Sequence, residues 1–372
     1  MKKFSSLLLI FNCFVIPQNR YNYGNSLNDV GKSIIDFNNG SKIIAGFSTS
    51  LERTDNDIKL IRINSYGETL WEKYLGGEDY DEAYYVLNND ESSFLITGKT
   101  ESFGSGESDG FLMKIDENGN AIWEKYYGDL GWDELFSIDH TNDNGFIAVG
   151  KITNRDRNDF NCWVVKINDM GEVLWSKNIG NSYWDEGRSV KATKDGGFIV
   201  SGYTFSRLKH FDAWLIKLDS DGNEEWQKSF GGLLDDRAFS VVETIDNKFI
   251  LLGFSYSIGK GGEIFLVKTN NIGDIIWEKY YGKNFDDYGK QIKIIDKDKY
   301  LIIGDSFNGK NYDIYLSEID KDGNEINNKI IDNGKNEISS SLLISNNKYF
   351  ILANLGSYPF LDTILYEFNF NN

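Results

Sequence analysis

The sequence predicts an all-β fold built from repeated units, and three observations support it. A block of about 52 residues recurs from about residue 24 to the C-terminus. Aromatic residues make up 15% of the chain and glycines number 37, a composition that suits strands and tight turns. The only prolines are Pro17 and Pro359, so nothing within the array resembles a proline-rich linker. A fixed period of this size indicates stacked units that share one core.

Tryptophan and glycine keep the register of the blocks. A Trp stands four residues after a Gly at Trp71, Trp123, Trp175, Trp226 and Trp277. The Gly of that step is Gly67, Gly119, Gly171, Gly222 and Gly273, and Gly323 continues the series. A second series is Gly46, Gly98, Gly150, Gly202, Gly253 and Gly304, with Asn354 in the seventh place. A third series is Gly24, Gly76, Gly128, Gly180, Gly231, Gly282 and Gly334.

Each block predicts four short strands separated by turns. In one block they are expected at residues 135–138, 146–149, 163–167 and 172–177, with turn-forming residues between them. The second strand is apolar on both faces and therefore needs cover on both sides. Four-stranded sheets stacked radially around an axis provide this cover, as in β-propellers.

The predicted fold is an all-β, seven-bladed β-propeller with four-stranded blades. Residues 1–17 are expected to be a signal peptide or disordered export segment, and residues 18–372 the propeller. The blades are expected at about 25–76, 77–128, 129–180, 181–231, 232–282, 283–334, and 335–372 plus 18–24. An open β-solenoid is the alternative. The last block has only three strands, and the residues before Gly24 match the end of a fourth, so an N-terminal strand is expected to complete the last blade and close the ring.

Two resemblances rest on the residues of one block. The residues are Asp212–Asp219, Gly222, Trp226, Gly231, Gly232, Asp235, Asp236, Ser240, Val241, Phe249, Ile250 and Gly253. Their pattern resembles the bacterial beta-propeller repeat (SBBP-like) family, which implies extracellular or cell-envelope proteins. Asp219, Gly222 and Trp226 are also similar to the tryptophan-docking motif of quinoprotein propellers. That likeness implies that the Trp series wedges between blades and that Asn327, in the sixth block, makes the weakest contact.

Charge and the N-terminus bear on partners and location. The formal net charge of −18 repels phosphates and anionic lipids, so nucleic acid is not an expected partner. The chain is expected to be a monomer. Lys2 and Lys3 precede the mostly apolar residues 7–16, which resemble a secretory signal and are too short to span a membrane. We expect a secreted, periplasmic or cell-surface protein without a transmembrane segment. Lipid anchoring at Cys13 stays open, and Cys162 is expected to be a buried thiol.

The alternation of strand direction places two kinds of connection at one face. These are the long loops between second and third strands and the connections from one block to the next. Long loops on a rigid scaffold commonly carry binding sites. Tyr80, Trp132 and Trp184 occupy equivalent places there in adjacent blocks, and we predict that they form a platform for sugar rings or a protein partner. The alternative is that each packs under the loops of its own blade.

An Asp follows each Gly of the third series by five residues. These residues are Asp29, Asp81, Asp133, Asp185, Asp236 and Asp287, and Ser339 holds the seventh place. The structural interpretation is that each carboxylate accepts backbone N–H groups of its loop. The functional alternative is a Ca²⁺ ion held near the axis.

The sequence contains no motif that indicates catalysis. No Ser-His-Asp set, metal-spaced His pair or phosphate-binding Gly loop occurs, and no cofactor is predicted. The chain is therefore interpreted as an exported, non-enzymatic scaffold that binds a glycan or protein partner through the face with the long loops. The alternative is a polysaccharide-acting hydrolase or lyase that uses paired carboxylates on the same face.

Overall fold

The computed structural model describes residues 17–24, 28–49, 55–157, 159–180, 183–205, 210–259, 261–282 and 285–369. Apart from Pro17, the expected export segment lies outside these residues, as does Cys13. The described residues form 28 strands and one short 3₁₀ turn, η1 (Asn38–Gly40), which confirms the all-β prediction. In this part of the chain, no helix has the length and apolar character needed to span a membrane.

Five sheets have four antiparallel strands each, in chain order. The first contains β6 (Asp81–Asn88), β7 (Ser93–Thr100), β8 (Asp109–Asp116) and β9 (Ala121–Tyr127). The second contains β10 (Glu134–His140), β11 (Phe146–Asn154), β12 (Asp159–Ile167) and β13 (Val173–Ile179). The third contains β14 (Asp185–Ala192), β15 (Phe198–Phe205), β16 (Phe211–Leu218) and β17 (Glu224–Phe230). The fourth contains β18 (Asp236–Glu243), β19 (Phe249–Ser255), β20 (Glu263–Thr269) and β21 (Ile275–Tyr281). The fifth contains β22 (Asp287–Asp296), β23 (Lys299–Phe307), β24 (Tyr312–Asp320) and β25 (Glu325–Ile331).

The remaining strands form one mixed sheet of eight strands, drawn from both ends of the chain. Its N-terminal members are β1 (Asn19–Asn22), β2 (Asn28–Asp36), β3 (Lys42–Thr49), β4 (Asn56–Ile63) and β5 (Thr69–Leu75). Its C-terminal members are β26 (Glu337–Ser345), β27 (Lys348–Ser357) and β28 (Phe360–Asn369). β1 pairs antiparallel with β28, from Asn19 opposite Glu367 to Asn22 opposite Ile364. β2 meets β28 in parallel at a single position, Asn28 opposite Leu361.

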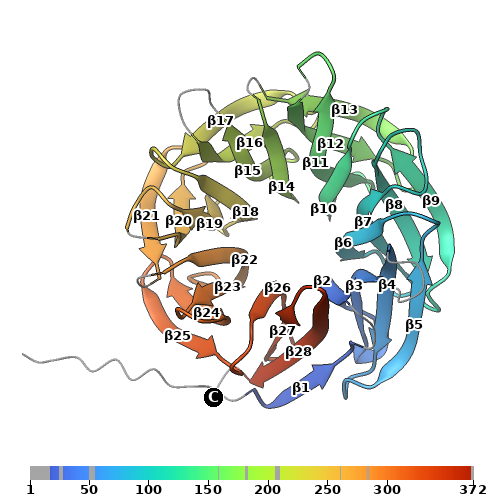
Figure 1. Cartoon of the computed structure of the whole chain (residues 1–372). Coiled ribbons are helices and arrows are strands. Elements are labelled where there is room, and N and C mark those ends of the chain that lie inside the picture. Colours follow the sequence, from blue (N-terminus) through green and yellow to red (C-terminus); the bar gives the residue numbers. More distant parts are fainter. Residues whose placement is uncertain are drawn as a thin grey trace, which may run out of the picture.

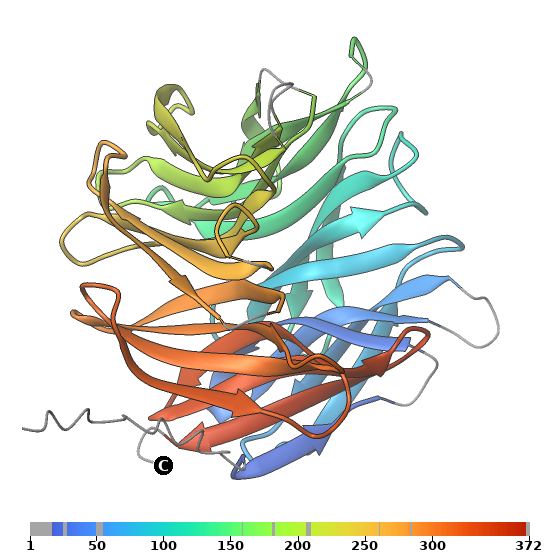
Figure 2. The same cartoon turned by 60° about the vertical axis from the view of Figure 1, so that its left-hand side comes forward.

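The sheets stand around a central opening, as in a β-propeller (Figure 1). In each four-stranded sheet the first strand lies innermost and the fourth lies on the outside, and β2 and β26 are the innermost strands of the eight-stranded sheet. Figure 2 shows neighbouring sheets facing each other, with the connections at the two ends of the strands. The propeller predicted from the repeats is therefore confirmed as the architecture.

The core lies between sheets and not within any one of them. The described residues form seven hydrophobic clusters, each of which combines side chains from neighbouring sets of strands. One cluster joins Val149 and Cys162 to Val200 and Trp214 of the next sheet. All seven residues of β19 are buried, as expected for a second strand that is apolar on both faces. Each sheet needs neighbours to cover both of its faces, so packing between sheets holds the arrangement together.

The tryptophan series makes one contact repeatedly. Trp226 of β17 packs on Gly273, in the β20–β21 turn of the next sheet, and its Nε1 donates to the Asn271 carbonyl at 3.1 Å. Trp277 packs in the same way on Gly323 and donates to the Lys321 carbonyl at 3.1 Å. The indole thus covers the turn of the following sheet, and a side chain at the Gly would occupy its place.

This contact can be tested with two glycines of matched backbone geometry. Gly323 has φ +76° and Gly334 has φ +75°, but a Cβ at Gly323 would lie 2.8 Å from Lys279 Cγ and 3.1 Å from the Trp277 ring, whereas at Gly334 it meets nothing within 4 Å. Both Gly→Ala variants should lose about 1–2 kcal/mol of unfolding free energy through the left-handed backbone. Gly323→Ala should lose about 1–3 kcal/mol more, because it forces the sheets apart.

Urea unfolding of both variants measures the difference between them. Equal destabilisation would show that the indole–glycine contact adds nothing to the joint between these sheets.

Candidate functional site

The long connections and the sheet-to-sheet connections share one end of the propeller, which we call the loop-rich end. For example, β6 runs away from this end and β7 returns to it, since Asp81 lies opposite Thr100. The predicted site residues lie here, each just before an innermost strand. Tyr80, Trp132 and Trp184 are 42%, 41% and 38% exposed, enough for each ring to reach a partner.

The three aromatic residues have different surroundings. The backbone N–H of Trp132 donates to Thr153 Oγ1 at 2.7 Å, while its indole makes no hydrogen bond within the described residues. The indole of Trp184 donates from Nε1 to Glu186 at 2.6 Å and packs on Phe160 with ring centroids 4.8 Å apart. Lys99 lies over the ring of Tyr80 at 5.9 Å. Trp132 is therefore the most available ring, and Trp184 is partly committed to its own loops.

The Asp series lies beneath the connections and is fully buried. Asp133 accepts from the backbone N–H groups of Asp129 at 2.6 Å and Thr153 at 2.8 Å. Asp236 accepts from the N–H of Gly232 and the hydroxyl of Ser257, both at 2.7 Å. These contacts are those of the structural interpretation, in which each carboxylate fixes its loop.

Other members of the series have comparable contacts. Asp81 accepts from Gly77 and Ser102, and Asp185 from Thr204. Asp29 forms an ion pair with Lys59 at 2.6 Å. Asp287 is buried at the start of β22. Among the described residues, no group of three or more His, Cys, Asp or Glu side chains could hold a metal ion. The Ca²⁺ hypothesis therefore has no geometric argument here and stays a prediction.

The seventh place of this series is held by Glu337 and not by Ser339. Glu337 opens β26 as Asp287 opens β22, two residues before the irregularity in each strand. The connection before β26 has the same length as that before β22, but its Gly stands two residues later: Asp332 holds the place of Gly282, so counting from Gly334 led to Ser339. Glu337 accepts from Asn333 and from the Tyr366 hydroxyl. A carboxylate thus opens this strand as well.

A second acid meets some of these carboxylates from the third strand of the preceding sheet. Burial raises the pKa of Asp133, and the nearby Asp129 and Asp109 raise it further. Burial likewise raises the pKa of Asp313 to about 6, and Asp332 and Glu337 add to the shift. Asp313, between the fifth four-stranded sheet and β26–β28, therefore keeps its proton at a pH well above the usual titration range of an aspartate.

This raised pKa predicts a stability change with pH. The folded pKa of Asp313, about 6, lies above the ordinary value of 3.8. The stabilisation is present below about pH 4 and is lost as pH rises through about 6. The unfolding free energy of the wild type should fall over this window by on the order of 1–3 kcal/mol from this group, and Asp313→Asn should flatten the fall.

Asp246→Asn is the matched control in the same chemical-denaturation series. Burial raises the pKa of its carboxyl, but hydrogen bonds from Lys248 and Thr244 outweigh this effect and lower the pKa to about 2. The carboxyl therefore stays charged from pH 4 to 6. The control should follow the wild-type slope, and an unaltered slope in Asp313→Asn would contradict the assignment.

The central opening is lined by one residue from each innermost strand. β2, β6, β10, β14, β18, β22 and β26 each have a register shift at the same place, where one residue is skipped in the pairing. The skipped residues are Lys32, Tyr84, Phe136, Arg188, Phe239, Lys290 and Ser340, and all of them line a cavity of about 520 Å³. We call them the bulge ring. A β-bulge re-aims its extra side chain, which explains why these residues face the opening.

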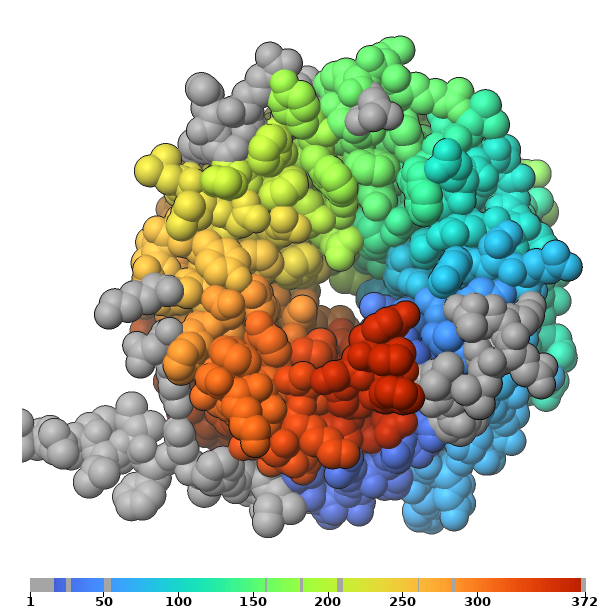
Figure 3. All heavy atoms as spheres, in the orientation of Figure 1, coloured from blue at the N-terminus to red at the C-terminus, as the bar shows by residue number. Residues whose placement is uncertain are grey.

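The second glycine series permits these bulges. At Gly253, a Cβ would lie 1.7 Å from the Arg237 carbonyl oxygen across the sheet, a distance that no side chain tolerates. In the last sheet Ala353 lies opposite Ser339, so Ala353 and not Asn354 holds the equivalent pairing position. Figure 3 shows the opening at the centre of the ring. The bulge ring was missed from sequence, although counting three residues beyond each Asp would have found six of its members.

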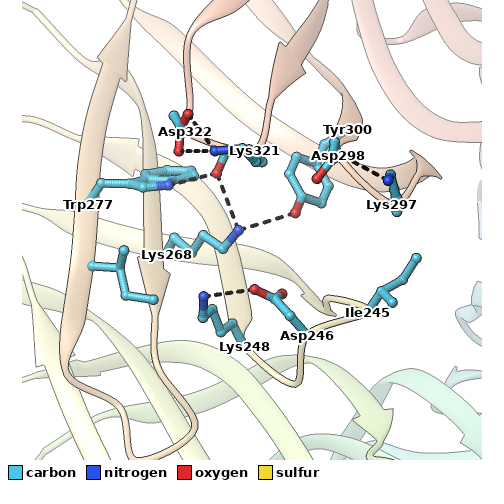
Figure 4. Close-up of a pocket in the computed structure, with 11 residues that line it drawn as sticks. Ile245, Asp246, Lys248, Lys268, Trp277, Lys297, Asp298, Tyr300, Lys321 and Asp322 are labelled. Atoms are coloured by element: carbon cyan, nitrogen blue, oxygen red, sulfur yellow. Dashed lines mark hydrogen bonds and ion pairs between the residues drawn. The ribbon is translucent and has the colours of Figure 1, made fainter.

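A second cavity, of about 280 Å³, lies at the opposite end, between β20–β21 and β22–β25 (Figure 4). Lys268 points into it and donates to the Tyr300 hydroxyl and the Lys321 carbonyl, both at 3.3 Å. Burial lowers the pKa of Lys268, and Lys248 and Lys321 lower it further. Within the described residues, Lys268 has no carboxylate within ion-pair distance. The equivalent Lys217 pairs with Asp195 at 3.0 Å and Glu225 at 3.1 Å.

These two lysines form a matched pair for mutation. Lys217→Met removes charged hydrogen bonds at a buried site and should cost about 1.5–3 kcal/mol of unfolding free energy. Lys268→Met should stay within about 0.5 kcal/mol of the wild type, because the cation it removes is poorly compensated. Chemical denaturation at pH 7 measures both, and equal losses would contradict the difference in pairing.

Comparisons with known proteins bear on the fold. No family model matches the chain, and no curated protein matches it. The structure is similar to Sqt1 from Chaetomium thermophilum, with 10% identity and a TM-score of 0.52 over 90% of this chain and 84% of that one. It is also similar to the β-propeller domain of the Trilobed protease from Pyrococcus furiosus, with 10% identity and a TM-score of 0.49 over 96% and 97% of the two chains. At these identities the likeness concerns the fold alone.

Proposed function

We propose that the chain is an exported, non-enzymatic scaffold that binds a protein partner through its loop-rich end. The observation that carries the proposal is the exposure of Tyr80, Trp132 and Trp184 there. Exposed aliphatic residues accompany them at the same end: Leu130 on the connection of Trp132, and Leu233 and Leu234 on the β17–β18 connection. Grouped aromatic and aliphatic side chains are typical of protein interfaces, whereas sugars are usually held by aromatic rings together with free polar groups.

The proposal includes a ring of seven blades closed by β1. Two features support this interpretation of the eight-stranded sheet. β2 and β28 share one parallel bridge, as Ser108 and Trp132 do between two separate sheets. The Tyr23 hydroxyl donates to the Gly67 carbonyl at 3.0 Å, as Tyr127 donates to Gly171 at 2.8 Å. β1 thus makes the contacts expected of an outermost strand.

The carboxylates of the central cavity do not favour the hydrolase alternative. Glu82, Glu134 and Glu186 line the central cavity, but each is engaged by a neighbouring group. Asn56 donates to Glu82 at 2.7 Å, and Lys151 lies 3.2 Å from Glu134. Glu186 accepts from the Tyr203 hydroxyl at 2.5 Å. These carboxylates are thus held by the fold, whereas a catalytic pair must be placed for substrate.

The test is binding by Trp132→Ala. A partner is recovered by pull-down with the full chain, and its Kd is measured by calorimetry. A central interface Trp contributes about 2 kcal/mol or more, so the Kd should rise about 30-fold while the melting temperature stays unchanged. Trp184→Ala should lower both binding and the melting temperature, since its indole is bonded to Glu186.

Tyr66→Ala is the control, because Tyr66 is 77% exposed at the opposite end. It should bind as the wild type does. Unchanged affinity in Trp132→Ala, or binding of a glycan array in place of protein, would reject a protein partner at this surface.

A further inference from the structure

The bulge ring concentrates positive charge in an acidic protein. The chain has a formal net charge of −18, yet the charged members of the ring are all cations: Lys32, Arg188 and Lys290. The other members are Tyr84, Phe136, Phe239 and Ser340. Seven inner strands thus place three cations and three aromatic rings at one level of the opening, and no carboxylate.

The cations are only partly compensated by the protein. Arg188 lies 3.2 Å from Glu186, and Lys290 lies 3.4 Å from Asp305. Lys32 has no hydrogen bond or ion pair within the described residues, and its ammonium lies over the rings of Phe47 and Tyr84 at 5.4 and 6.0 Å. Burial lowers the pKa of Lys32, Glu82 opposes this, and the charges of Arg188 and Lys290 lower it further. The three cations are therefore close enough to repel one another.

Below the ring, away from the loop-rich end, the opening stays cationic. A cavity of about 150 Å³ there is lined by Lys32, Arg188, Lys191, Lys290 and Lys293, and by no carboxylate. The residue after each bulge completes the wall. These residues are Ser33, Tyr85, Ser137, Ser189, Ser240, Gln291 and Ser341. Hydroxyl groups beside cations are the donors that an oxyanion requires.

The aromatic members orient the cations. The Arg188 guanidinium stacks on Phe136 at 4.1 Å and lies 5.6 Å from Phe239. Stacking fixes the plane of the guanidinium and leaves N–H groups at its edge for a planar or tetrahedral oxyanion. The Lys290 ammonium lies over the same Phe239 ring, 5.8 Å from its centroid. The carboxylates that line the larger cavity, Glu82, Glu134 and Glu186, stand two residues before Tyr84, Phe136 and Arg188 and are engaged as described above.

We propose that the central opening binds a small oxyanion, a phosphate or carboxylate group, between Lys32, Arg188 and Lys290. Its negative charge relieves the repulsion among these cations, and the serines below them donate hydrogen bonds to it. The cavity of about 520 Å³ lies within the range of small-molecule sites, so the anion can belong to a larger molecule. This site does not depend on the partner proposed for the loop-rich end.

The test is calorimetry with the full chain at pH 7.5, with inorganic phosphate as the probe and sodium chloride at equal ionic strength as the reference. Phosphate should bind and chloride should not. Lys32→Met and Lys290→Gln should each weaken phosphate binding about tenfold or more. Lys297→Met is the control, because Lys297 is 78% exposed at the opposite end, and its affinity should equal that of the wild type. The second arm compares glucuronate with glucose. Binding of glucuronate but not of glucose would identify a sugar carboxylate as the source of the anion.

A thermal measurement separates binding from loss of structure. Without phosphate, Lys32→Met should melt at or above the wild-type temperature, because it removes repulsion. Addition of phosphate should raise the melting temperature of the wild type and leave that of Lys32→Met unchanged. Trp132→Ala should keep the full phosphate response even if it loses its partner. The proposal is overturned if neither phosphate nor glucuronate binds, if chloride acts equally, or if both ring variants keep wild-type affinity.

Discussion

Each sheet of this protein is apolar on both faces, and no sheet can satisfy that constraint alone. Val149 and Cys162 are covered only because Val200 and Trp214 approach from the next sheet. At other joints the indole series adds a hydrogen bond, since Trp226 and Trp277 each cover a turn of the next sheet and donate to one of its carbonyl groups. The core therefore lies at the joints between neighbouring sheets, and packing between the units stabilises the molecule.

The same repeated geometry shapes the wall of the central opening. Every innermost strand carries a bulge at one height, and the glycine opposite makes room for it. Backbone irregularity is repeated without change while the side chain at the bulge is free to differ. That freedom places Lys32 next to Tyr84 and Arg188 next to Phe136 around one opening. The repeated backbone bulge thus carries a different side chain in most of the innermost strands.

Much of this architecture could be predicted from the sequence, and the exceptions have a physical reason. Period, turn residues and apolar second strands predicted four strands per block, although β11 extends to Asn154, beyond the expected end at residue 149, because polar residues also pair. The bulge ring was missed because a bulge interrupts the alternation from which facing is inferred. Glu337 was missed because Asp332 stands at the usual Gly place in the last connection, and the Gly from which the position was counted lies two residues later. Exposure of Tyr80, Trp132 and Trp184 agrees with their predicted place, and their role stays a prediction.

The pairing of β1 with β28 also sets an order of events during synthesis. The side chain of Asn19 donates to Glu367, 348 residues later in the chain, at 3.1 Å. β1 therefore has no partner until β28 has been synthesised. Contacts of such long sequence separation form late, after the local hairpins of the intervening sheets. Until β28 has been synthesised, the edge of β1 stays unpaired, so this seam is exposed longer than the hairpins within the other sheets.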